Sequence, residues 1–319
     1  IHGSPTAVMV YGEGEDCLGE IVGDEMGGMR AMFVMMNNAR LMVGCQGVQI
    51  AERATQQAQR YAAERVQSSL AGSADRTPVT IEHHPDVKRM LWRMRAQTEA
   101  ARALIYYASA PTDFGKLGDE AAKLRADVLI PLAKAHATDI GCEVASLGVQ
   151  VHGGMGFIEE TGAAQHYRDA RIAPIYEGTN GIQAADLVGR KLGLAGGDGV
   201  RSLLGDIAHA AADFPPLAEL AETCRHVTDW LEQASTPDRL AGSYPYLTML
   251  ATATCGWLMA LQNRAARAAL DAGEGDTAFL EAKIASTRFY LEQIVPAATG
   301  LAASALAGDA ALAPLPAIA

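Results

Sequence analysis

The sequence predicts a mainly α-helical protein. Its 319 residues are 49% hydrophobic but only 6% aromatic, and Ala, Leu and Met are abundant, a composition that favours packed helices over a β-rich fold. From residue 29 onward, apolar residues recur at spacings of three and four, which is the period of one face of a helix. The length is sufficient for about two domains with a buried core.

Strands are expected only near the start of the chain. Residues 6–11 (TAVMVY) are β-prone, and residues 17–22 form a second short apolar run after an acidic, glycine-rich turn. Because two short strands are only marginally stable alone, we expect them to pack on something else or to belong to a larger sheet. The chain starts at Ile1, without an initiator Met and inside this region, so we expect it to be a fragment.

The first long helix is expected over residues 29–65, which keep the helical period and are rich in strong helix formers. Gly44 and Gly47 lie inside it, and each costs roughly 1 kcal/mol relative to Ala in a helix. Glycines at such positions indicate that another helix approaches closely.

Further helices follow after a loop at residues 68–80 that is rich in Ser, Gly and Thr. A second helix is expected from Pro85 to about residue 110, ending before Pro111, since proline is favoured in a first turn and disfavoured in a helix interior. A third is expected over residues 119–152 with a kink at Pro131.

The rest of the chain is also expected to be helical. A short helix covers residues 161–171, and another starts at Asn180, where Asn180 and Gln183 resemble a capping box. A glycine-rich linker at residues 193–199 precedes three more helical blocks and an Ala/Pro-rich tail. These blocks cover residues 200–233, 237–272 and 276–306.

Charge and cysteine content restrict the function. A net charge of −11 and a pI near 5.2 repel nucleic acids and anionic membranes. The five cysteines are scattered without CxxC spacing, which fits a reducing cytoplasm and suggests neither disulfides nor a zinc site. The histidines form no metal-ligand set, so we expect no metal. No run approaches the roughly 20 apolar residues of a membrane-spanning helix, and no signal peptide is visible.

The chemistry of the chain is concentrated in residues 150–183, QVHGGMGFIEETGAAQHYRDARIAPIYEGTNGIQ. Glycines at 153, 154 and 156 allow close approach of a ligand, and the helix from Asn180 offers free N–H groups and a positive dipole end. With Glu177 nearby, they suggest a phosphate-bearing cofactor beside a carboxylate. Taken alone, Glu177 could instead complement the helix dipole, and the glycines could simply end a helix.

This segment closely resembles the signature of the acyl-CoA dehydrogenase flavoproteins, a QxxGGxGF loop followed by a YEGT turn. The two motifs stand at residues 150–157 and 176–179, and the similarity covers most of residues 19–192. The resemblance implies the end of the family's middle β-domain at residues 1–24 and its C-terminal helical bundle at residues 25–192. Residues 200–319 would then be an added helical extension, as in the long bacterial branch with 3-methylthiopropionyl-CoA and fatty acyl-CoA dehydrogenases.

The resemblance also implies a reaction, the FAD-dependent α,β-dehydrogenation of an acyl-CoA thioester to the trans-2-enoyl-CoA. Glu177 would remove the α-proton while the β-hydrogen leaves as hydride to the flavin N5, and its backbone N–H would help to polarise the thioester carbonyl. Arg40 and Gly178 would bind the substrate, and Thr179 would contact the flavin. FAD would be contacted by Gln150, Gly153 and Gly154. The FAD of a neighbouring subunit would be contacted by Arg65 and Gln67.

As in the family, the expected partners are an acyl-CoA substrate, an electron-transfer flavoprotein as acceptor, and further copies of the chain in a homodimer or homotetramer. The helices over residues 29–65 and 119–152 would build the subunit interface. Two other classes stay open: a DNA-associated homologue of the alkylation-response type, and a non-catalytic helical assembly module. The acidic charge disfavours the first, and the intact Glu177 disfavours the second. Fold analogy does not name the acyl chain.

Overall fold

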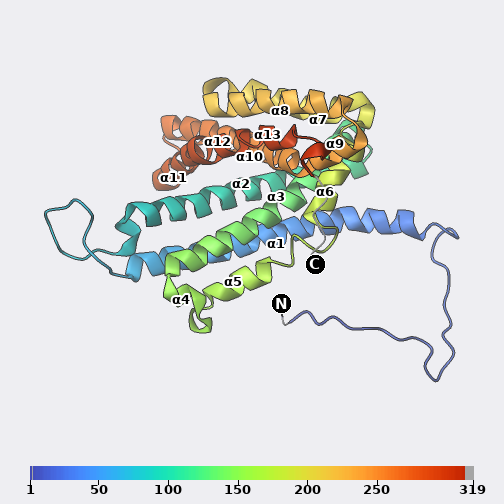
Figure 1. Cartoon of the computed structure of the whole chain (residues 1–319), viewed down its shortest axis with the longest axis horizontal. Helices are drawn as coiled ribbons and strands as arrows, with labels where there is room; N and C mark the ends of the chain where they lie inside the picture. Colours follow the sequence, from blue (N-terminus) through green and yellow to red (C-terminus); the bar gives the residue numbers. More distant parts are fainter. Residues whose placement is uncertain (2, 313–319) are drawn as a thin grey trace.

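The computed structural model describes residue 1 and residues 3–312, and its regular structure there is helical apart from one isolated bridge between Val66 and Thr80. Three long helices pack side by side as a bundle, with two short helices below them (Figure 1). The bundle helices and their short companions are α1 (Gly28–Glu64), α2 (Pro85–Lys116), α3 (Glu120–His152), α4 (Gly154–Phe157) and α5 (Ala163–Ala170).

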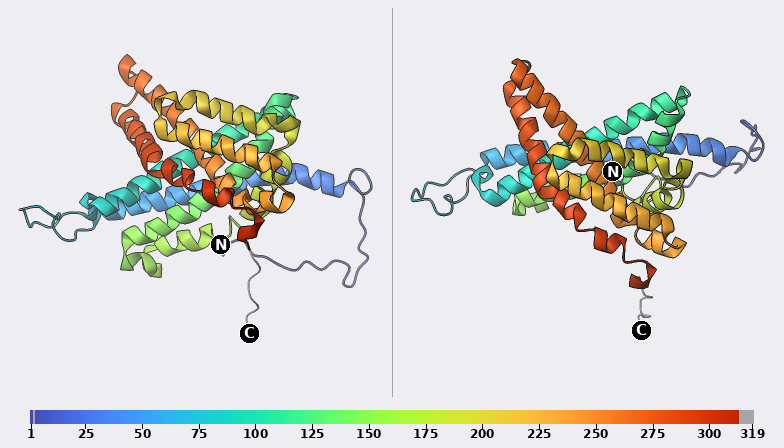
Figure 2. Two further views of the ribbon diagram at one scale, coloured as in Figure 1. Left: turned by 45° about the horizontal axis from the view of Figure 1, so that its top comes forward. Right: turned by 90° about the horizontal axis from the view of Figure 1, so that it is seen from above.

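A second helical layer covers one side of this bundle, and Figure 2 shows its long helices crossing the bundle helices at a steep angle. The helix α6 (Asn180–Asp186) lies at the junction and continues into a π-helical turn, Leu187–Lys191. The second layer contains α7 (Asp198–Ala210), α8 (Pro215–Gln233), α9 (Thr236–Ala241), α10 (Ser243–Ala272), α11 (Thr277–Phe289), α12 (Val295–Thr299) and α13 (Ala302–Ala305).

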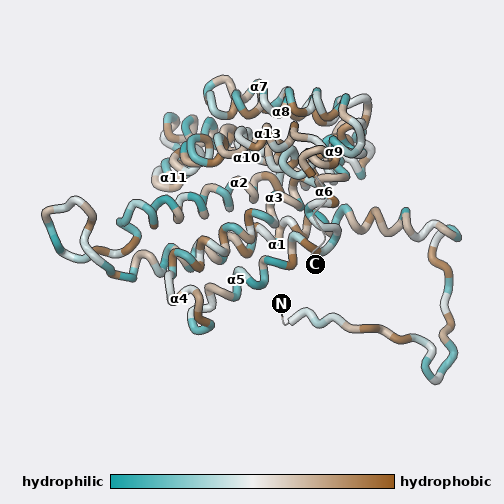
Figure 3. The backbone as a smooth tube through the Cα atoms, in the orientation of Figure 1, coloured by the Kyte–Doolittle hydropathy of each residue, from teal (hydrophilic) through white to brown (hydrophobic). Residues whose placement is uncertain are grey.

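The strands expected near the N-terminus are wrong for this structure. Residues 6–11 and 17–22 have no β-structure, and they extend away from the bundle although Figure 3 shows hydrophobic stretches in them. Val8 is 92% exposed and Val22 is 97% exposed. A strand is stable only when a neighbour pairs with its backbone, and the described part of the chain offers no such sheet edge.

The close helix contact expected at Gly44 and Gly47 is confirmed. A Cβ built on Gly47 would lie 2.3 Å from the carbonyl oxygen of Ala137 on α3, and one on Gly44 would lie 2.5 Å from Ile105 on α2. From the other side, a Cβ on Gly141 of α3 would lie 2.9 Å from the Gly47 backbone. Glycine on both sides therefore lets the backbones of α1 and α3 touch.

The third helix begins as expected, because the Asp119 side chain caps α3 by accepting a hydrogen bond from the Ala122 N–H. The expected end of the second helix is wrong, since α2 runs through Pro111 to Lys116. Proline has a helical φ and removes only one backbone hydrogen bond. The last turn is retained by packing, because Gly115 lies against Lys123 of α3.

The second layer packs on the bundle through its apolar faces. Trp257 of α10 meets Tyr107 of α2 edge to face, with ring centroids 5.1 Å apart. Leu258 is 7% exposed, whereas Leu261 is 41% exposed and lies outside the contact. Fully buried apolar side chains on these faces include Leu203, Ile207, Leu247 and Leu250.

Candidate active site

Glu177 lies on a tight turn just before α6. Its φ is 58°, an uncommon value for a residue with a side chain, and the φ of Gly178 is 82°. A Cβ built on Gly178 would lie 2.9 Å from the side-chain nitrogen Nε2 of Gln183. Glycine at 178 therefore meets both a conformational and a steric requirement.

The helix start after this turn differs from the expected capping box. Thr179 is the cap, because its Oγ1 accepts a hydrogen bond from the Ile182 N–H at 3.2 Å. The Asn180 side chain is 3% exposed and points into α3, where its Nδ2 donates to the carbonyl oxygen of Ala135 at 3.1 Å. The pairing of Asn180 with Gln183 was wrong because tertiary contacts occupy the Asn180 amide.

The carboxylate of Glu177 is partly exposed, and within residues 1 and 3–312 no side chain or backbone group forms a hydrogen bond or ion pair with it. The Glu177 N–H also takes no part in the backbone hydrogen bonds of this described region. The neighbouring Tyr176 hydroxyl, in contrast, donates to Gln46 of α1. Glu177 thus offers an unengaged proton acceptor and an unengaged N–H donor on the same residue.

Beneath this turn lies Lys134 of α3, which the sequence analysis missed. Its side chain is fully buried, and its Nζ donates to the carbonyl oxygen of Gly178 at 2.8 Å and to Asn180 Oδ1 at 2.9 Å. Loss of hydration on burial lowers the pKa of Lys134 to about 8, although Asp139 and Glu177 oppose this shift with their negative charges. The sequence offers one sign of this buried residue, a lysine within the largely apolar run of residues 128–137.

Arg40 of α1 lies on the other side of the same turn. A Cβ built on Gly178 would be 3.9 Å from Arg40 Nη2, and the guanidinium is 4.0 Å from Asp186 of α6. Arg40 is only 7% exposed, and its Nε is buried without a hydrogen-bond partner in the described part of the chain. The structure therefore places Arg40, Lys134 and Gly178 together with Glu177.

The expected cofactor-binding glycines lie elsewhere, at the far end of α3. Gly153 ends this helix with φ 60° and ψ −138°, and its N–H donates to the carbonyl oxygen of Gln150. Cβ atoms built on Gly153 or Gly154 would meet nothing within 4 Å, whereas one on Gly156 would lie 2.2 Å from a backbone oxygen. Gly156 is thus required by internal packing, while Gly153 and Gly154 leave their backbone open to a ligand.

Arg65 and Gln67 lie at this same end, just after α1. Their backbone is fixed by the segment before α2, since Ile81 N–H donates to the Arg65 carbonyl and the Gln67 N–H donates to Val79. Both side chains are exposed. The stacked rings of Tyr61 and His152, 4.4 Å apart, join the ends of α1 and α3 there.

The predicted site residues therefore form two groups, one beside the middle of α3 and one at its C-terminal end. Lys134, below Glu177, and Gln150 are separated by roughly 24 Å along α3, at about 1.5 Å of rise per residue. Arg65, Gln67 and the glycines are not brought to Glu177 within one chain.

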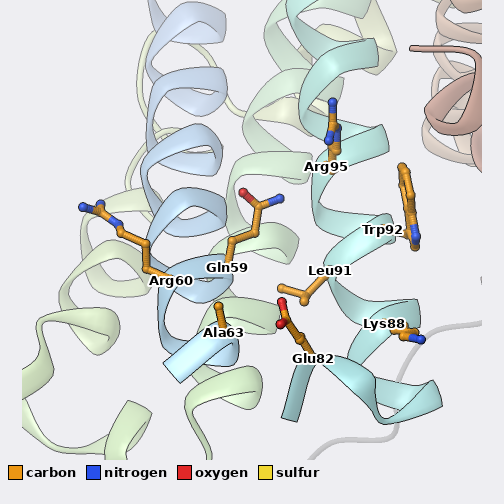
Figure 4. A pocket seen from close by; sticks show the side chains of 8 residues that line it. All are labelled: Gln59, Arg60, Ala63, Glu82, Lys88, Leu91, Trp92 and Arg95. Carbon is orange, nitrogen blue, oxygen red and sulfur yellow. The ribbon is translucent and has the colours of Figure 1, made fainter. Parts of the chain in front are cut away.

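A cavity of about 460 Å³ opens between α1 and α2, and Glu177 does not line it. Figure 4 shows Gln59 and Leu91 pointing into the space between the two helices and Arg60 pointing away from it. The remaining lining residues are Ala63, Glu82, Lys88, Trp92 and Arg95. None of the described helices is long and apolar enough to cross a membrane, and in the same described part no cluster of His, Cys, Asp or Glu could hold a metal ion.

Comparison with known families identifies the bundle. Residues 26–192 match the acyl-CoA dehydrogenase C-terminal domain. The chain belongs to the acyl-CoA dehydrogenase family. Residues 200–316 match a second family, described as acetyl-CoA dehydrogenase C-terminal like.

Curated relatives of this acyl-CoA dehydrogenase family member match along most of the chain. It is 44% identical over 313 residues to the 3-methylmercaptopropionyl-CoA dehydrogenase of Ruegeria pomeroyi, covering 92% of this chain and 53% of that protein. It is 31% identical over 334 residues to a butyryl-CoA dehydrogenase of Syntrophomonas wolfei, covering 97% of this chain and 55% of that protein. The chain thus spans about half the length of these relatives.

Solved structures show the same fold. An acyl-CoA dehydrogenase from Bacillus anthracis complexed with FAD matches with a TM-score of 0.67 at 20% identity, covering 86% of this chain and 49% of that one. ACDH-11 of Caenorhabditis elegans in complex with C11-CoA matches with a TM-score of 0.66 at 20% identity, covering 86% of this chain and 46% of that one.

Proposed function

We propose that this chain is the helical part of an FAD-dependent acyl-CoA dehydrogenase that oxidises an acyl-CoA thioester to the trans-2-enoyl-CoA. The observation that carries the proposal is the turn at Glu177, where a carboxylate without hydrogen-bond partners in the described structure stands above Lys134 and Arg40. The same turn has the YEGT sequence of the family. In this proposal Glu177 is the base that removes the α-proton.

The neighbouring residues would prepare the turn for this proton transfer. Lys134 fixes the Gly178 carbonyl from below, and the Glu177 N–H would donate to the thioester oxygen as negative charge develops on it. The buried cations of Lys134 and Arg40 would further stabilise negative charge near the turn, because charges interact strongly where water is excluded. Thr179, at the start of α6, would contact the flavin.

The residues at the far end of α3 fit a dinucleotide. Gly153 and Gly154 expose backbone that a phosphate could approach without meeting a Cβ, and Arg65 offers an exposed guanidinium that suits a pyrophosphate. Gln67 and Gln150 supply polar side chains beside them. FAD held by such residues would supply the hydride acceptor of the reaction.

The separation of the two groups supports an assembly of several chains. Because Gln150 lies roughly 24 Å along α3 from the position of Lys134, we propose that Arg65 and Gln67 serve the FAD of a neighbouring subunit in a homodimer or homotetramer. Electron transfer onward would use a partner electron-transfer flavoprotein, and we propose a cytoplasmic location. Rapid peroxide formation in air would instead indicate an oxidase.

The test is the substitution Glu177→Gln in the full-length flavoprotein, mixed with a panel of acyl-CoA esters. The relatives named above make 3-methylmercaptopropionyl-CoA and butyryl-CoA the first members of the panel. The amide keeps the shape but cannot accept the proton, so bound flavin should remain while its bleaching by substrate slows by about 10²- to 10⁴-fold.

The matched control is Glu281→Gln on α11, which removes another exposed carboxylate and should leave bleaching unchanged. Reduction of the Glu177→Gln flavin within about tenfold of the wild-type rate would exclude Glu177 as the base.

A further inference from the structure

A chain of hydrogen-bonded polar side chains connects the second helical layer to the turn at Glu177. Its outer member, Tyr244, is 40% exposed, and its inner member, Lys134, is fully buried. Tyr244, in the first turn of α10, donates its hydroxyl hydrogen bond to Asp139 Oδ2 of α3 at 2.5 Å. The other oxygen of Asp139 accepts from Asn180 Nδ2 of α6 at 2.8 Å. Asn180 Oδ1 in turn accepts from Lys134 Nζ, which also holds the Gly178 carbonyl.

The inner part of this chain, at Asn180 and Lys134, is held by further contacts, whereas Tyr244 is joined to Asp139 by one hydrogen bond. Thr138 receives a hydrogen bond from Asn180 Nδ2 at 2.9 Å and donates to the carbonyl oxygen of Lys134 at 2.8 Å. Asn180 and Lys134 are almost completely buried. In such surroundings an unmade hydrogen bond is costly, so the geometry of one member constrains the next.

Asp139 joins the second layer to the bundle within this chain of hydrogen bonds. Burial raises the pKa of its carboxyl group, while hydrogen bonds from Tyr244 and Asn180 and the charges of Lys134 and Arg171 act in the opposite direction. The donors on either side of Asp139 therefore compensate for the loss of water. Without the Tyr244 hydroxyl, Asp139 Oδ2 would lose its donor from the second layer.

We propose that Tyr244 is a positioning residue of the second layer, which acts through Asp139, Asn180 and Lys134 to hold the Glu177–Gly178 turn in place. This inference rests on the proposed function for its catalytic consequence, but the mechanical link is a property of the fold. It gives the extension a role in the chemistry of the bundle, beyond covering its apolar surface.

The experiment compares Tyr244→Phe with Tyr246→Phe in the full-length flavoprotein. Tyr246 lies two residues further along α10, is fully buried, and shares a hydrogen bond with Thr228 of α8 inside the second layer. Both variants lose one hydroxyl from the same helix. Only Tyr244 is connected to the turn.

The first readout is amide hydrogen exchange of the peptide covering residues 175–182, which requires no catalysis. Tyr244→Phe should accelerate exchange in this peptide by about threefold to tenfold, corresponding to one net hydrogen bond. Tyr246→Phe should lower the melting temperature and accelerate exchange in α8, leaving residues 175–182 unchanged. Equal exchange in residues 175–182 for Tyr244→Phe and the wild type would overturn the proposal.

The second readout is the rate of flavin bleaching by the best acyl-CoA of the panel. Tyr244→Phe should lower the limiting rate by a similar factor with little change in the substrate concentration at half-saturation, and Tyr246→Phe should not. A limiting rate that is equal in Tyr244→Phe and the wild type would overturn the catalytic part. If the wild-type flavin is not bleached by any ester, the proposed function fails, and hydrogen exchange alone decides whether Tyr244 holds the turn.

Discussion

Replacing Gly47 by alanine tests the contact between α1 and α3, the helices that carry Arg40 and Lys134 of the candidate site. Gly47 lies on α1 two turns after Arg40, and it touches α3 one turn after Lys134. A Cβ at this position would lie 2.3 Å from the Ala137 oxygen, 2.8 Å from its carbonyl carbon and 2.9 Å from Thr138 Cα. All three atoms belong to the backbone, so the two helices would have to move apart.

The size of the effect follows from two opposing terms. Overpacking of a tight contact costs about 1–3 kcal/mol, and a clash with backbone places Gly47→Ala at the upper end. The better helix propensity of alanine returns roughly 1 kcal/mol. We therefore expect Gly47→Ala to lower the free energy of unfolding by about 2 kcal/mol.

The matched control is Gly205→Ala on α7, an exposed helical glycine whose built Cβ meets nothing within 4 Å. It should raise stability by up to about 1 kcal/mol through helix propensity alone. Urea unfolding followed by far-UV circular dichroism would measure both variants, with an unchanged denaturant dependence as the check on two-state behaviour. Equal or greater stability of Gly47→Ala than of the wild type would refute the close contact of α1 and α3.

Three further predictions concern stability. Burial lowers the pKa of His136 to about 4, below the ordinary value near 6.5, so between these pH values the unfolded chain binds a proton that the folded chain does not. Acidification from pH 6.5 to 4 should therefore lower the free energy of unfolding by up to about 3 kcal/mol. The variant His136→Gln should show a smaller loss in urea titrations at a series of acidic pH values. Asp119→Ala should cost about 1 kcal/mol in the same assay, because the α3 cap is lost. Deleting residues 200–319 from the full-length protein should lower its melting temperature or its oligomeric state, because the apolar contacts of α10 with α2 are removed; unchanged melting and assembly would contradict a structural role.

The sequence predicted the long helices well because their signals are local. The apolar period over residues 29–65 and Pro85 in the first turn of α2 act within one or two turns of chain. The strands at residues 6–11 and 17–22 failed for the opposite reason. A strand is stabilised by a partner distant in sequence, and local β-propensity does not show whether that partner is present.

The candidate site was predictable only in part. Glu177 and Gly178 are found by a contiguous motif, whereas Lys134 and Tyr244 act through contacts between helices far apart in the sequence. Neither of these two side chains belongs to a motif of recognisable spacing. The assignment of Gln150, Arg65 and their neighbours to FAD stays a prediction.

Lys134 shows why the site was not optimised for stability alone. Its buried ammonium group is disfavoured by the loss of water, which is the main cause of its lowered pKa, and an apolar residue would avoid that cost. The hydrogen bonds to Gly178 and Asn180 compensate for part of it, and they do so only when the turn and α6 hold their observed positions. Because the buried Lys134 ammonium group needs these two hydrogen bonds, it favours the one conformation of the Glu177 turn in which both are made. The α-proton transfer that we propose for Glu177 needs such a fixed position.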